Sequence, residues 1–289
     1  MLKILLNRIS KKPVKLLDFN YWVWVNRINV YRLIILPRYQ TGFTSIFNKK
    51  IKFVDACTLV YGYTELFEKK IYEFDAKNSN PLIIDCGANI GLSVIFFKQL
   101  YPHSSIIAYE ADPNIFNTLQ FNIDSFYLKD VEALNRAVWI SDDEEISFRI
   151  EGGYSGRIPK AGEDMKNIES HAKVKTVRLK DIIASSERRI DFLKIDVEGA
   201  EADIILDCAT VLDKVDHLFI EYHSHIKEKQ RLQEILSVLE SSGFRYHIKE
   251  AFCSDAPFKD RSKHQMLEMD LQLDIYCYRL CSWGGDMNG

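Results

Sequence analysis

The stretch LIIDCGANIG, residues 82–91, decides the fold of this chain. An apolar run of strand type leads into a turn with glycine at Gly87 and Gly91, and a helix-like segment follows. Glycine in such a turn lets the backbone approach a ligand or the next helix closely, as after the first strand of nucleotide-binding folds. The spacing G-x-x-x-G is neither the G-x-G-x-x-G of dinucleotide-binding folds nor a P-loop. The stretch therefore predicts a strand-turn-helix ligand site and argues against NAD or ATP.

Strand-like and helix-like segments alternate along most of the chain. Helices are expected at residues 61–74, 92–100 and 114–125, and strands at residues 82–84, 105–110, 131–139, 190–196 and 217–223. This alternation predicts an α/β fold of Rossmann-like type, with a mainly parallel, twisted sheet and helices on both faces. Two late runs, 245–252 and 271–280, have no long helix between them and predict an antiparallel hairpin at the C-terminal edge of the sheet.

Two acids stand where such a fold holds its ligand. Asp85 precedes the glycine turn, and a carboxylate there suits a positively charged ligand such as an ammonium or sulfonium group better than a pyrophosphate. Glu110 ends the second strand, where Rossmann-like folds hold ribose hydroxyls with an acid. A helix cap at Asp85 and a solvated loop acid at Glu110 are the structural alternatives.

Further candidates follow the later strands. Asp196 ends the run at residues 190–196, and His223 ends the run at residues 217–223. The carboxyl ends of the strands border the ligand crevice of open α/β sheets, so both side chains are expected at the crevice.

Four blocks of the sequence together resemble the FkbM family of S-adenosylmethionine-dependent methyltransferases. They are DCGANIG (85–91), YEADP (109–113), NRAV (135–138) and, most diagnostic, LKIDVEGAE (193–201). The resemblance covers roughly residues 61–252. It implies a class I methyltransferase fold, S-adenosylmethionine as the cofactor, and O-methylation of a hydroxyl on a sugar, glycan or natural product. The cofactor-binding residues it implies are Asp85, Gly87, Asn89 and Gly91 on the methionine side, Glu110 at the ribose, and Asn135 and Ala137 near the adenine.

The catalytic candidates are Lys194, Asp196, Glu198 and His223. The acidic block that includes Glu198 and Glu201 would position the substrate, cap the next helix or bind a divalent ion, and we assign no metal ligand from sequence. Methyl transfer to a hydroxyl requires loss of a proton. His223, whose ordinary pKa lies near neutral pH, and Asp196 are the two candidate bases, beside a mechanism with no protein base.

The charge of the chain is unevenly distributed. Residues 1–52 hold eleven Lys or Arg and one acid, Asp18, for a net charge of +10, whereas the remainder carries −13. We divide the chain into a basic N-terminal extension (1–60), a methyltransferase domain (61–282) and a tail (283–289). The aromatic segment 19–39 contains too many arginines to span a membrane. Either it packs on the domain, or it rests peripherally on an anionic membrane at its inner face.

Location and partners are expectations of the same kind. The six cysteines form no C-x-x-C pair and suggest reduced thiols, and the apolar run after Lys3 is broken at Asn7 and Arg8, so that no signal peptide is predicted. A cytoplasmic location is expected, with a small molecule or glycan as acceptor; the oligomeric state stays open.

Two other functional classes compete with this interpretation. One is a noncatalytic, membrane-associated binding module that keeps the fold. The other is a nucleic-acid methyltransferase whose basic extension contacts phosphates. The acidic body and the absence of an N-P-P-Y-type tetrapeptide after the strand at residues 190–196 argue against nucleic acid as a partner.

Overall fold

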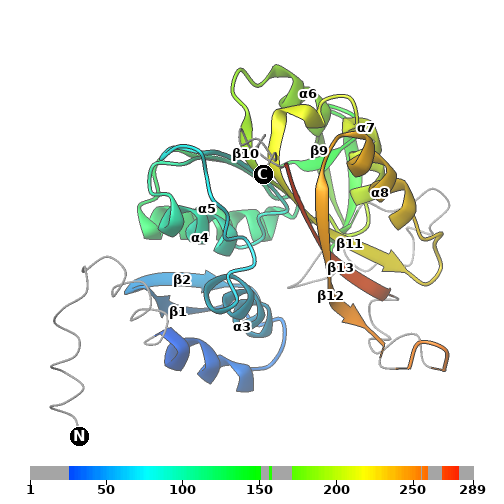
Figure 1. Cartoon of the computed structure of the whole chain (residues 1–289). Helices are drawn as coiled ribbons and strands as arrows, with labels where there is room; N and C mark the ends of the chain where they lie inside the picture. Colours follow the sequence, from blue (N-terminus) through cyan, green and yellow to red (C-terminus); the bar gives the residue numbers. More distant parts are fainter. Residues whose placement is uncertain (1–25, 151–155, 158–170, 255, 260–268, 280–289) are drawn as a thin grey trace, which may run out of the picture.

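The computed structural model describes residues 26–150, 156–157, 171–254, 256–259 and 269–279. A seven-stranded sheet with the order β12-β13-β11-β10-β3-β4-β5 forms its centre (Figure 1). The strands are β3 (Leu82–Cys86), β4 (Ser105–Tyr109), β5 (Val131–Leu134), β10 (Ile190–Ile195), β11 (Val215–His225), β12 (Arg245–Cys253) and β13 (Met269–Tyr278). Neighbours from β5 to β11 are parallel, whereas β13 is antiparallel to β11 and β12. The predicted sheet and C-terminal hairpin are confirmed, with β13 inside and β12 at the edge.

Helices cover both faces of the sheet because buried side chains alternate along its strands. Ile83 and Phe192 belong to one hydrophobic core, and the residues that follow them, Ile84 and Leu193, belong to the other, as the two-residue period of a strand requires. The first face carries α4 (Leu92–Leu100) and α5 (Pro113–Phe126), and the second carries α6 (Leu179–Ser185), α7 (Glu201–Cys208), η5 (Leu212–Lys214) and α8 (Leu232–Ser241). Figure 1 shows the two helical layers on opposite sides of the sheet.

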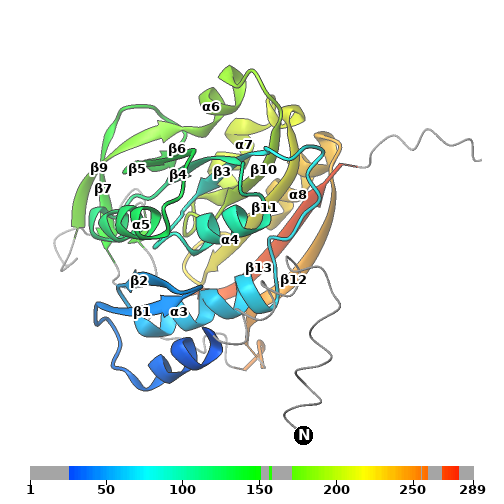
Figure 2. The same cartoon turned by 90° about the vertical axis from the view of Figure 1, so that its left-hand side faces the viewer.

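An N-terminal layer packs on α5 and continues the first core. It contains η2 (Arg32–Ile35), the antiparallel hairpin of β1 (Gly42–Ile46) and β2 (Lys49–Phe53), α3 (Ala56–Tyr63) and η3 (Thr64–Glu68) (Figure 2). The buried Asn122 of α5 joins this layer to the turn after β3. Its Oδ1 accepts from Lys52 N at 2.8 Å, and its Nδ2 donates to Lys52 O at 3.0 Å and Ile90 O at 2.7 Å.

The N-terminal extension is thus partly built into the fold. Residue 60, the predicted end of the extension, lies inside α3. Ile46, Ile51 and Phe53 share a core with residues of α4 and α5. Arg27 pairs with Glu68 at 2.7 Å. The arm at residues 1–25 and the tail at residues 283–289 lie outside the described residues. Among those that are described, no helix combines the length and the apolar character needed to cross a membrane.

The expected helix at residues 61–74 begins earlier and ends earlier. Asp55 caps α3 through Thr58 N at 3.0 Å, so the helix starts at Ala56; η3 ends at Glu68, and Lys70 has a φ of 55° that interrupts helical geometry. An aspartate that bonds the third backbone N–H ahead is a favoured N-cap, which explains the earlier start.

The expected strand at residues 131–139 is two strands in different sheets. After β5, the side chain of Asn135 donates to Glu110 O at 2.8 Å and Ala111 O at 2.9 Å, and the chain turns away. It continues as β6 (Ala137–Trp139) in a four-stranded sheet with the order β6-β9-β7-β8, together with β7 (Glu145–Ile150), β8 (Gly156–Arg157) and β9 (His171–Arg178). An apolar run alone does not reveal such a change of partner.

Candidate active site

The glycine turn brings the ends of β3 and β10 into close contact. Gly87 has a φ of +89°, and a Cβ on it would lie 1.9 Å from Asp196 O. Gly91 has the same φ, but a Cβ there would meet only side-chain atoms of Leu119, the nearest being Cδ1 at 2.7 Å. Both positions favour glycine through their left-handed backbone, and Gly87 is also required by the neighbouring strand.

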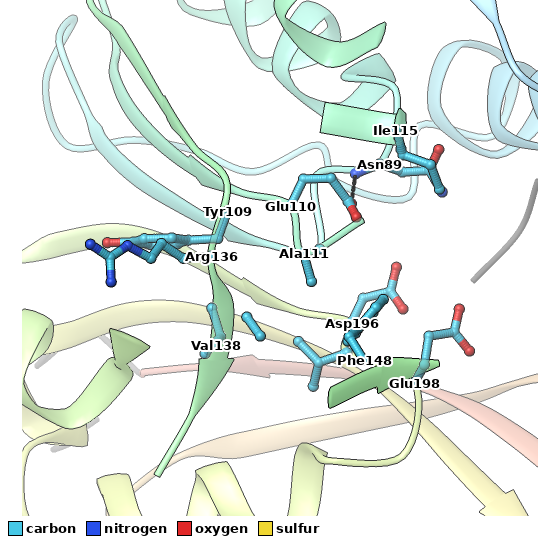
Figure 3. Close-up of a pocket in the computed structure, with 13 residues that line it drawn as sticks. Asn89, Tyr109, Glu110, Ala111, Ile115, Arg136, Val138, Phe148, Asp196 and Glu198 are labelled. Carbon is cyan, nitrogen blue, oxygen red and sulfur yellow. Dashed lines mark hydrogen bonds between the residues drawn. The ribbon is translucent and has the colours of Figure 1, made fainter. Parts of the chain in front are cut away.

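Glu110 lies directly beyond the turn and organises it. Its two carboxyl oxygens accept from Asn89 N at 2.9 Å and Asp112 N at 2.8 Å, and Figure 3 shows the first of these bonds. Burial raises the pKa of Glu110 to about 7, although the two backbone N–H donors oppose the shift. A carboxyl group held at the carboxyl end of β4 in this way is preorganised to receive hydroxyl donors from a ligand.

A cavity that is open to solvent lies between these elements. Several of the residues that line the cavity were predicted as site residues from the sequence: Gly87, Asn89, Glu110, Ala137, Asp196 and Glu198. The other lining residues are Tyr109, Ala111, Ile115, Arg136, Val138, Phe148 and Val197. In Figure 3 the carboxylates of Asp196 and Glu198 extend in the same direction on the side opposite Val138. The cavity therefore has an acidic end at Asp196 and Glu198.

Asp85 and Lys194 lie behind the cavity wall. Asp85 is fully buried; Ser93 Oγ donates to its Oδ2 at 2.5 Å, and Lys194 Nζ lies 3.3 Å from its Oδ1. Lys194 Nζ also lies 3.1 Å from Asp196 Oδ2 and donates to Gly87 O at 2.7 Å. The pair positions the turn, and a direct contact of Asp85 with a donor molecule stays a prediction.

The charge of Lys194 is set by its neighbours. Although burial alone would lower its pKa, the carboxylates of Asp196 and Asp85 raise the pKa above the ordinary lysine value. Lys194 therefore holds its proton and acts as a fixed cation between two carboxylates.

His223 is a buried imidazole among carboxylates. Its Nδ1 lies 2.9 Å from Glu201 Oε1, and its Nε2 lies 3.5 Å from Glu198 Oε2 and 3.7 Å from Glu221 Oε1. Burial would lower the pKa of His223, but the carboxylates of Glu198 and Glu201 raise it well above the ordinary value. An imidazolium has no lone pair with which to accept a proton, so this geometry does not favour His223 as the general base.

A match to a protein family decides the identity of the chain. The family described as the methyltransferase FkbM domain matches residues 85–246. The chain belongs to the FkbM methyltransferase family. The family match begins at Asp85 and includes Glu110, Asp196 and His223, and it covers every residue that lines the cavity.

Two curated relatives carry methyltransferase names. Methyltransferase 1 of Beauveria bassiana is 28% identical over 207 residues, which cover 65% of this chain and 81% of the relative. Methyltransferase sdnD of Sordaria araneosa is 28% identical over 171 residues, which cover 50% and 66%. A solved structure, methyltransferase FkbM from Methylobacillus flagellatus, aligns with a TM-score of 0.40 and 14% identity over 92% of this chain and 63% of that chain.

A second solved structure, of a putative transferase from Pyrococcus horikoshii, aligns over 84% of this chain and 73% of that chain with a TM-score of 0.46 and 13% identity.

Three more of the residues predicted for the site of this FkbM methyltransferase lie outside the cavity lining, as Asp85, Lys194 and His223 do. Asn135 holds the segment at Glu110 and Ala111 through their carbonyl oxygens. Glu201 accepts from Gly199 N at 2.9 Å and Val197 N at 3.3 Å, so it fixes the loop that carries Glu198. Gly91 supports the approach of α5.

Sequence reasoning did not name three apolar residues of the cavity lining. They are Ile115 of α5, Val138 of β6, which closes the NRAV block, and Phe148 of β7. Ile115 stands just after the YEADP block and was within reach of the motif. Phe148 was not, because β7 reaches the cavity only through its pairing with β9 in the second sheet.

Proposed function

We propose that this FkbM methyltransferase transfers a methyl group from S-adenosylmethionine to a hydroxyl oxygen of a small molecule, sugar or glycan. One observation carries the proposal: Glu110 and Asp196, at the carboxyl ends of β4 and β10, line the same cavity as the glycine turn. Ligands of open α/β sheets bind at this edge.

The residues present fit S-adenosylmethionine. The cradle at Gly87 has no room for a Cβ, and the Glu110 carboxyl group suits the two hydroxyls of a ribose. Ile115, Val138 and Phe148 offer apolar contacts for an adenine ring. The acidic end of the cavity suits a ligand that carries ammonium and sulfonium charges.

The acidic end also suits the acceptor. When bound, S-adenosylmethionine supplies a methyl carbon that bonds to the acceptor oxygen as its bond to sulfur breaks, with the electron pair left on sulfur. Asp196 and Glu198 are partly exposed, at 23% and 30% of their side chains, and stand on the cavity wall. We assign to this carboxylate pair the orientation of the acceptor hydroxyl and the acceptance of its proton.

Calorimetric titration with S-adenosylhomocysteine tests the donor site. Wild type and a Glu132→Gln control, altered at an exposed acid of β5, are expected to bind alike. Glu110→Gln is expected to bind at least about tenfold more weakly, because it loses a charge-assisted hydrogen-bond acceptor. No binding by wild type would overturn the proposal.

Transfer is tested separately with isotope-labelled S-adenosylmethionine and a panel of hydroxylated acceptors. Asp196→Asn is expected to keep S-adenosylhomocysteine binding and to lose about 10²-fold or more of turnover, as removal of a proton acceptor does. Label on nitrogen or carbon instead of oxygen would overturn the assignment of O-methylation.

A further inference from the structure

Three potential metal ligands meet beside the cavity, on adjacent strands. Asp196 follows β10, and Glu221 and His223 lie two residues apart on β11, so they share a face of that strand. One ligand atom from each lies within 4.8 Å of the others. Ligand atoms that bind one ion at about 2.0–2.3 Å are separated by such distances or less.

The two carboxylate side chains are each held by a neighbour. Gln272 Nε2 donates to Glu221 Oε1, and Lys194 Nζ lies 3.1 Å from Asp196 Oδ2. Metal ligands are commonly oriented in this way by a second layer of hydrogen bonds.

The imidazole provides the observation that distinguishes this group from a simple acidic cluster. The His223 side chain is only 3% exposed, and its Nδ1 is bonded to Glu201. Its Nε2 is directed toward Glu221 and Glu198, whose nearest oxygens, at 3.7 and 3.5 Å, are beyond a good hydrogen bond. A histidine that binds a metal ion through Nε2 commonly has its Nδ1 hydrogen-bonded to a carboxylate, as His223 has. Its Nε2 then points away from that carboxylate, toward the ion.

We propose that Asp196, Glu221 and His223 Nε2 bind one divalent cation at the carboxyl ends of β10 and β11. Two carboxylates and one imidazole, with coordination positions left for water, suit Mn²⁺ or Mg²⁺. The cation takes the place of the proton on Nε2, while Nδ1 keeps its bond to Glu201.

The position of the cation gives it a role that rests on the proposed function. Asp196 belongs both to this group and to the cavity wall. An acceptor hydroxyl bound to the cation would lie at the acidic end of the cavity and lose its proton more readily, because a bound cation lowers the pKa of a ligating oxygen acid. An acceptor with two adjacent oxygens would bind such a cation as a chelate.

Manganese binding tests the site without reference to catalysis. The full chain is treated with a chelator, dialysed and titrated with MnCl₂, and free Mn²⁺ is followed by electron paramagnetic resonance. Wild type is expected to bind one Mn²⁺ per chain, displaced by excess Mg²⁺. Glu221→Gln and His223→Gln are expected to weaken binding at least about tenfold. The control Glu234→Gln, which alters a surface ion pair of α8, is expected to bind as wild type does.

Circular dichroism and S-adenosylhomocysteine titration of each variant show whether it is folded and holds the donor. Absence of saturable Mn²⁺ binding by wild type would overturn the cation site, as would equal binding by folded Glu221→Gln, His223→Gln and wild type. Donor binding without Mn²⁺ binding rejects the cation site alone, whereas Mn²⁺ binding without donor binding supports the cation site and counts against the proposed function.

Discussion

Alanine at Gly87 and at Gly91 should separate two reasons for glycine in the same turn. Both residues have a φ of +89°, so both substitutions impose the same left-handed strain, about 1–2 kcal/mol. Both also reduce the entropy of the unfolded chain to a similar extent. The difference between the two variants therefore isolates what the new methyl group meets.

The obstacles differ in how easily they move. At Gly91 the methyl group meets Leu119 Cδ1 at 2.7 Å, the end of a flexible side chain. At Gly87 it meets the backbone oxygen of Asp196 at 1.9 Å, and Asp196 N is itself bonded to Cys86 O at 3.1 Å. We expect Gly87→Ala to cost about 1–3 kcal/mol more than Gly91→Ala, the range for overpacking a rigid site.

Urea denaturation followed by circular dichroism measures this difference as the change in free energy of unfolding. Because Asp196 lines the cavity, Gly87→Ala should also weaken S-adenosylhomocysteine binding more than Gly91→Ala does. If the two variants differed by less than about 0.5 kcal/mol, the close approach of β3 and β10 would not be the reason for glycine at position 87.

Three further predictions concern buried polar groups. Burial raises the pKa of Glu110 to about 7, so its contribution to stability is complete below the unfolded pKa of 4.5 and is lost as pH rises through 7. The free energy of unfolding in urea should therefore fall between pH 5 and pH 8 by up to about 3 kcal/mol less in Glu110→Gln than in wild type. An equal fall in the two proteins would contradict this. Lys194→Met should cost about 3–5 kcal/mol by leaving buried carboxylates uncompensated, and Asp85→Asn in the same chain should recover part of it; strictly additive losses would argue against their coupling. Asn122→Ala should cost about 2–4 kcal/mol and speed amide exchange near Ile90, since it removes three bonds to backbone; unchanged exchange would refute the link.

Local sequence signals predicted the parts of the site that lie next to a strand end. The glycine turn, Glu110 and Asp196 each follow an apolar run, and the parallel sheet brings their strands to one edge. The helix at residues 92–100 was predicted with the bounds of α4. These features depend on spacing along the chain, which sequence records directly.

Features set by contacts between distant segments were not predictable in this way. Phe148 reaches the cavity through a second sheet, and the strand at residues 131–139 divides because Asn135 bonds to a loop 24 and 25 residues earlier. The charge of His223 depends on Glu198, Glu201 and Glu221 together. Neither a propensity nor a short motif contains such information.

The shared first core has a practical consequence for anyone shortening this protein. The family match ends at residue 246, before β13, and begins at residue 85, after the β1–β2 hairpin and α3. A fragment cut at those limits would expose the edge of β11 and the apolar side chains that pack on Ile46 and Phe53. Bare strand edges and uncovered apolar faces favour self-association, so such a fragment should precipitate during expression while the longer chain remains tractable.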